Sequence, residues 1–151
     1  MDKKKIAEYV SKIGSSKSMQ GENRDCAVLA LSAAFEVSYD TAHKFAEVKW
    51  GRKKKQGTIT RNIINTMNEV TAVTPLFSKR AQSAPVINEY PTKKGVVKCK
   101  SKLGTFANKN PKGTYFVLVR EHATVVKDGI ILDNYAPGST VKFAWKINDA
   151  M

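Results

Sequence analysis

The spacing of apolar residues changes near the middle of the chain. Before about residue 75 they recur three or four positions apart, which predicts helices, and after it short alternating runs predict strands. Helices are expected at residues 3–13 and 26–36, in a third segment capped by Ser38 and in a fourth capped by Thr58. Strands are expected at about 71–77, 96–100, 114–120, 122–127, 130–135 and 141–145.

Helices followed by an antiparallel sheet indicate an α+β fold, with Cys26 on a central helix packed against the sheet. A chain of 151 residues that is 42% hydrophobic can bury one core, which predicts a single domain over 1–151 with residues 1–19 as an N-terminal helical extension. Val141, Phe143 and Trp145 alternate and should share one side of the last strand. Residues 78–93 are expected to be a surface loop.

The termini and the cysteines bear on the compartment. No apolar run reaches 18 residues, so no transmembrane helix is expected, and the start Met1–Lys5 lacks the apolar segment of a secretory signal. The two cysteines do not form a disulfide framework, and no Cys or His pair has the spacing of metal ligands. We therefore expect a cytoplasmic protein with no metal and no cofactor.

Cys26 and His122 carry the candidate chemistry. Cys26 opens an apolar helical run, where unpaired N–H groups and the helix dipole stabilise a thiolate. His122 opens a predicted β-hairpin far along the chain. A thiol beside an imidazole is what a cysteine nucleophile requires, so the pair predicts a small thiol hydrolase.

The second cysteine and the second histidine occupy positions less suited to catalysis. Cys99 lies in the predicted strand 96–100 and is interpreted as a small packing residue. His43 lies inside the third helix among polar neighbours. It is interpreted as a surface residue or as one that supports the site from outside.

The hairpin that begins at His122 predicts its own register. Asp128-Gly129 between two apolar runs favours a two-residue type I′ turn, which pairs Lys127 with Ile130. Because directly opposed residues share a face, Asp133 would then be the diagonal neighbour of His122.

An acidic group at that position would orient the imidazole and stabilise the imidazolium. A turn longer by one residue would exchange the two faces and make Asn134 the partner of His122 instead of Asp133. The two-residue turn, and with it Asp133, is favoured.

Gln20 lies six residues before Cys26, in a polar loop that leads into the helix. Its amide could join the Cys26 backbone N–H in an oxyanion hole, which stabilises the charge on a carbonyl oxygen under attack. The alternative is a solvated loop glutamine. The order of Gln, Cys, His and acid along the chain favours the catalytic role.

This order of Gln20, Cys26, His122 and Asp133 resembles that of the papain-like cysteine peptidase superfamily. The chain looks most similar to small, largely uncharacterised papain-fold proteins of bacteria and their phages, from about Gln20 to the C-terminus. The segments that carry the similarity are Arg24–Leu31, Val37–His43, Gly51–Arg52, Gly57–Thr58, Pro111–Tyr115 and His122–Asp133.

The resemblance implies a papain-like fold and assigns a role to each candidate residue. Cys26 would be the nucleophile, His122 the general base and then acid, Asp133 the orienting acid and Gln20 the oxyanion donor. The implied activity is that of a peptidase or amidase acting on a protein or peptide substrate. A deamidase or acyltransferase with the same triad is one alternative, and a catalytically idle binding protein is another. A phage origin would place the protein in the host cytoplasm.

The charge points to a further class of partner. The chain has 26 Lys and Arg against 13 Asp and Glu, which gives a net charge of +13. Such a field attracts nucleic acid or an acidic protein, although a solvated surface that maintains solubility is the simpler interpretation. No membrane partner is expected. The basic clusters are Lys3–Lys5, then Arg52, Lys53, Lys54 and Lys55, and finally Lys93, Lys94, Lys98, Lys100 and Lys102.

Overall fold

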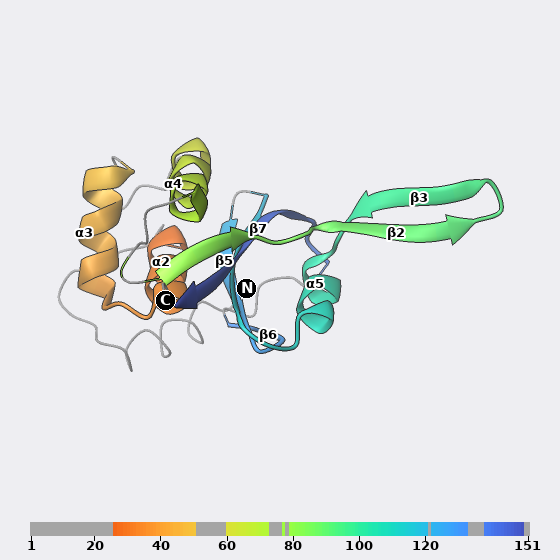
Figure 1. The fold of residues 1–151 in the computed structure, drawn as a ribbon. Helices are drawn as coiled ribbons and strands as arrows, with labels where there is room; N and C mark the ends of the chain where they lie inside the picture. Colours follow the sequence, from red (N-terminus) through yellow and green to blue (C-terminus); the bar gives the residue numbers. More distant parts are fainter. Residues whose placement is uncertain are drawn as a thin grey trace.

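The computed structural model describes residues 26–50, 60–72, 77, 79–120, 122–132 and 138–149 (Figure 1). Within them the chain has an α+β fold with four helices and a five-stranded antiparallel sheet, which confirms the predicted class. The helices are α2 (Cys26–Phe35), α3 (Tyr39–Lys49), α4 (Thr60–Ala72) and α5 (Leu103–Lys109). The strands are β1 (Lys79–Ser83), β2 (Ile87–Thr92), β3 (Gly95–Lys100), β4 (Thr114–Val119), β5 (His122–Lys127), β6 (Ile130–Ile131) and β7 (Val141–Asp149).

Helix α2 occupies the centre of the fold because it is apolar on every side. All of its residues from Ala27 to Phe35 are buried, and only Cys26 is half-buried. The helix packs against β5 and β4 on one side and against α3 on the other. The predicted helix over 26–36 is therefore confirmed to within one residue.

Helix α3 begins at the predicted cap. The Ser38 Oγ accepts a hydrogen bond from the Thr41 N–H at 3.2 Å. At the other end, the Trp50 indole N–H donates to the Thr66 Oγ1 at 2.9 Å, and the Asn62 amide donates to the Trp50 carbonyl at 3.0 Å. These bonds join the end of α3 to α4.

Replacing Ser38 by Ala should lower the free energy of unfolding by about 1 kcal/mol, because the Thr41 N–H loses its acceptor in the first turn of α3. Urea unfolding followed by far-UV circular dichroism measures the change. Ser38→Asp is the control, since its carboxylate can still accept the bond and suits a helix N-terminus. An equal loss in both variants would show that the cap is not the cause.

The main sheet has the strand order β1-β7-β4-β5-β6, with antiparallel pairing throughout. Helices α2, α3 and α4 lie on one side of it and α5 lies on the other (Figure 1). A hydrophobic core lies on each side of the sheet, and the alternating side chains of β4 contribute to both. Phe116 faces α2, whereas Tyr115 packs against Phe106 of α5 with ring centroids 5.4 Å apart.

The prediction for the last strand was wrong at one residue. Phe143 and Trp145 share a face and stack at a centroid distance of 6.0 Å, but Val141 lies in the core on the opposite side, beside α5. The register of β4 and β7 shifts between Leu118 and Val119, because β7 carries one extra residue there. A β-bulge of this kind reverses the facing of every residue beyond it.

Other predicted boundaries also need correction. The strand expected at 71–77 is wrong at both of its described ends, because α4 continues to Ala72 and Phe77 lies in a turn. The expected strand 130–135 is β6, which ends at Ile131. The surface loop expected at 78–93 is wrong, since this segment contains β1 and β2. Helix α5 was not predicted, although Leu103, Phe106 and Ala107 have helical spacing and are buried.

Strands β2 and β3 form a separate two-stranded hairpin, which we call the β2–β3 arm. It extends away from the sheet and from α5 (Figure 1). Every residue of β3 is exposed, and in β2 only Asn88 is buried. At its base the Ser101 N–H donates to the Val86 carbonyl at 2.7 Å, and the Val141 N–H donates to the Ser101 carbonyl at 2.8 Å, so the arm is attached to β7.

Some predictions concern residues outside the described ranges. These are the helix at 3–13, the extension 1–19 and the Thr58 cap of α4. In the part of the chain that is described, no helix is both long and apolar enough to cross a membrane.

Candidate active site around Cys26 and His122

Two distant segments meet where α2 packs against β5. Cys26 is the first residue of α2, and His122 is the first residue of β5. Because the helix lies against this strand, the thiol and the imidazole come into contact, and the two side chains share a hydrogen bond. Both residues are half-buried, so the pair lies at the edge of the core and remains accessible.

The surroundings of Cys26 act on its pKa in opposite directions. Burial is the largest single influence and raises the pKa of the thiol. The hydrogen bond with His122, the positive charge of that imidazole and backbone hydrogen bonds with Ala123 and Ala27 all lower it. Together they outweigh burial, so the pKa of Cys26 lies below its ordinary value. This is the direction that a nucleophilic thiol requires.

The Ala123 and Ala27 backbone donors were not identified from the sequence. Ala27 is the second residue of α2, where helix N–H groups have no partner within the helix, so its contribution agrees with the expected effect of a helix N-terminus. Ala123 follows His122 on β5. Every residue type except proline carries a backbone N–H, so the sequence cannot show which of them binds the thiol. Only the packing of α2 on β5 shows that the Ala123 backbone reaches Cys26.

The hairpin after His122 has the predicted two-residue turn. Lys127 pairs with Ile130, and both turn residues have positive φ, 50° at Asp128 and 80° at Gly129, as a type I′ turn requires. The Asp128 carboxylate also accepts a hydrogen bond from the Gly113 N–H at 3.0 Å. The register is therefore confirmed as far as Ile131, and the longer turn is excluded.

Three candidate residues lie outside the described ranges. They are Gln20, Asp133 and the alternative acid-position residue Asn134. The roles assigned to Gln20 and Asp133 stay predictions. The confirmed turn was the premise on which Asp133 was favoured over Asn134.

Cys99 differs from its predicted role. It lies on β3 as expected, but it is exposed, so its interpretation as a packing residue was wrong. All six residues of β3 are exposed, so Cys99 shares the exposure of its strand. His43 lies on α3 and is half-buried, with its ring 5.8 Å from that of Tyr39.

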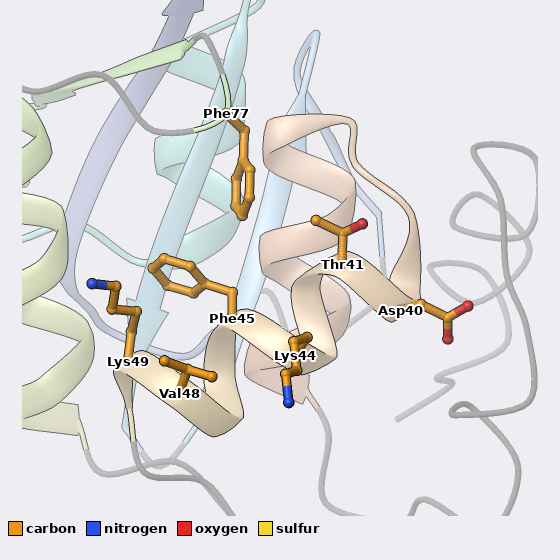
Figure 2. A pocket seen from close by; sticks show the side chains of 7 residues that line it. All are labelled: Asp40, Thr41, Lys44, Phe45, Val48, Lys49 and Phe77. Atoms are coloured by element: carbon orange, nitrogen blue, oxygen red, sulfur yellow. The ribbon is translucent and has the colours of Figure 1, made fainter.

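An apolar hollow among the described residues lies away from Cys26 (Figure 2). It has a volume of about 490 Å³, and Phe45, Val48 and Phe77 form its apolar wall. Phe77 contacts Phe35, the last residue of α2, at a centroid distance of 6.2 Å. Cys26 is the first residue of that helix, and neither Cys26 nor His122 lines the hollow. It is not part of the candidate site.

The basic cluster expected at Arg52, Lys53, Lys54 and Lys55 lies outside the described residues. Across the described ranges, no group of three His, Cys, Asp or Glu side chains is placed to hold a metal ion.

Comparison with known proteins identifies no relative: no protein-family model, no curated protein and no solved structure matches this chain. The chemistry of the site therefore rests on the geometry of the chain itself.

Proposed function

We propose that this protein is a papain-like cysteine hydrolase that cleaves an amide or another acyl bond. The observation that carries the proposal is the contact between Cys26 and His122, together with the lowered pKa of the thiol. The fold supports it, because the thiol lies at the N-terminus of a buried helix packed on an antiparallel sheet, as the resemblance to papain-like peptidases implies.

The reaction would proceed in two stages. His122 takes the thiol proton, the Cys26 sulfur attacks the acyl carbon, and the imidazolium returns the proton to the leaving amine as the carbon–nitrogen bond breaks. A thioester on Cys26 remains. His122 then takes a proton from water, the hydroxide attacks the thioester, and the acid leaves as the thiol recovers its proton.

The other predicted residues have supporting roles in this proposal. The Asp133 carboxylate would hold the imidazole in the tautomer that faces the sulfur. The Gln20 amide and the Cys26 N–H would donate to the oxyanion of the tetrahedral intermediate. Protein or peptide is the proposed substrate class, and a reducing cytoplasm, which keeps Cys26 as a free thiol, is the proposed compartment.

The pH dependence of Cys26 alkylation by iodoacetamide tests the assembled pair. The experiment uses the Cys99→Ser background, because the exposed Cys99 would react as well. Since only the thiolate reacts, a lowered pKa moves the rise in rate below the ordinary thiol pKa of about 8.5. We expect measurable alkylation below that pH.

Replacing His122 by Ala in the same background should shift the rise in rate to higher pH. Burial then raises the pKa of the Cys26 thiol without the opposing effect of His122. The rate of alkylation at pH 6 should therefore fall by about tenfold or more. His43→Ala is the matched control, because His43 is the other histidine of the chain and lies on α3. Rates that rise only near pH 8.5 in all three proteins would refute the thiolate–imidazolium pair.

A further inference from the structure

The β2–β3 arm exposes an unusual combination of side chains. Residues 87–100 contain four lysines and one acidic residue, Glu89, and no arginine. Lys93 and Lys94 form the exposed turn at its tip, between the paired residues Thr92 and Gly95. The arm therefore carries a concentrated positive charge away from the body of the protein.

Apolar side chains accompany these lysines. Pro91 is paired with Val96 on one face near the tip, and Tyr90 is paired with Val97 on the other. Val96 is 62% exposed, Val97 50% and Tyr90 46%. A two-stranded hairpin has no second layer to cover such residues, so both faces are available to a partner.

The base of the arm is held in place. The Lys109 ammonium of α5 donates to the Asn88 amide oxygen at 2.6 Å, and the Lys100 ammonium lies 5.7 Å from the centre of the Phe143 ring. With the backbone bonds at Ser101, these contacts fix the direction in which the arm leaves the sheet. A partner at the tip would therefore meet a positioned element.

The charge selects the kind of partner. A second copy of the chain is disfavoured, since the whole molecule carries +13 and two arms would repel each other. Lysine is depleted in protein–protein interfaces, where arginine is enriched, so four lysines without arginine do not suit an acidic protein. Lysine ammonium groups do suit phosphates, which they neutralise as point charges.

We propose that the β2–β3 arm binds duplex DNA by inserting into its major groove, with the tip lysines on the phosphates. That groove is about 12 Å wide and 8.5 Å deep and accepts a two-stranded β-ribbon. Six residues per strand make the arm roughly 20 Å long, which is enough to lie across the groove with its tip at the phosphates of the far edge. The exposed apolar side chains then contact base edges such as thymine methyl groups. This inference is independent of the proposed hydrolase activity.

Fluorescence anisotropy of the full chain with a labelled 20-base-pair duplex of mixed sequence tests the proposal. We expect Lys93→Gln/Lys94→Gln to weaken binding by roughly tenfold or more at 100 mM salt. The slope of log K against log salt should become less steep by about 1.8, as two phosphate contacts are lost. The matched control, Lys44→Gln/Lys49→Gln, removes the same charge from the exposed surface of α3, on the far side of the molecule, and should leave the slope nearly unchanged (Figure 1).

Several outcomes would overturn the proposal. They are the absence of duplex binding at low salt, and an equal weakening in the arm and control variants, which would show general charge attraction. Equal affinity for a single strand of the same length would exclude groove insertion. Equal competition by poly-glutamate at matched charge would indicate an acidic protein partner instead. The assay does not use the Cys26 thiol, so its result stands apart from that of the alkylation experiment.

Discussion

Cys26→Ala is expected to abolish the burst of p-nitrophenolate that the protein releases from p-nitrophenyl acetate. In the proposed reaction the Cys26 sulfur takes the acetyl group and releases one p-nitrophenolate per protein molecule. Without the sulfur no thioester forms, and the rate of acylation should fall by about a thousandfold or more, in line with the loss of a nucleophile in other hydrolases.

The burst amplitude and the mass of the trapped protein measure this effect. In the Cys99→Ser background, the quenched protein should carry one acetyl group on Cys26. His122→Ala should retain the sulfur but acylate more slowly, by roughly a hundredfold, because the general base is lost. Far-UV circular dichroism of each variant checks that the fold persists. A burst of equal size in Cys26→Ala would show that acylation occurs elsewhere, and the hydrolase proposal would fail.

Trp145→Ala is expected to lower the free energy of unfolding by about 3–5 kcal/mol. Trp145 is 1% exposed and lies between Phe116, at a ring-centroid distance of 6.3 Å, and Phe143, at 6.0 Å. Truncation leaves a cavity in the core between the sheet and α2. Since a domain is stable by only about 5–15 kcal/mol, the loss is a large share of the total.

Trp145→Phe is the matched control for this prediction. The Trp145 indole N–H has no hydrogen-bond partner among the described residues, so replacing the ring by Phe removes a buried, unpaired donor while it keeps an aromatic ring. Its cost should be well below that of the alanine variant. Urea unfolding measures the free energy of unfolding of both variants, and an unchanged m-value shows that the difference is one of stability. Equal destabilisation by both variants would show that the ring does not fill the site as described.

The predictions that succeeded depend on interactions between neighbouring residues in the sequence. Ser38 caps α3 because its hydroxyl reaches the N–H of Thr41, three residues on. Asp128 and Gly129 form the type I′ turn because both tolerate positive φ, and the turn then sets the pairing of β5 with β6. The apolar run after Cys26 becomes a buried helix because no polar face interrupts it.

Several predictions that failed concern strands whose pattern is set by distant partners. Strand β1 has one buried residue, Ala81, and exists because it pairs with β7. Strand β2 is almost entirely exposed, so its alternation carries no hydrophobic signal. The extra residue of β7 opposite Leu118 and Val119 moves Val141 to the other core.

The sequence by itself determined helices α2 and α3, the hairpin turn and the choice of Cys26 and His122 as candidates, because each follows from short-range chemistry. Only the tertiary structure decided that the thiol meets the imidazole, since this contact needs α2 to pack against β5 across nearly a hundred residues of chain. It also decided that residues 87–100 leave the sheet as an arm. Burial and strand pairing depend on which distant segments meet, and local residue patterns do not contain that information.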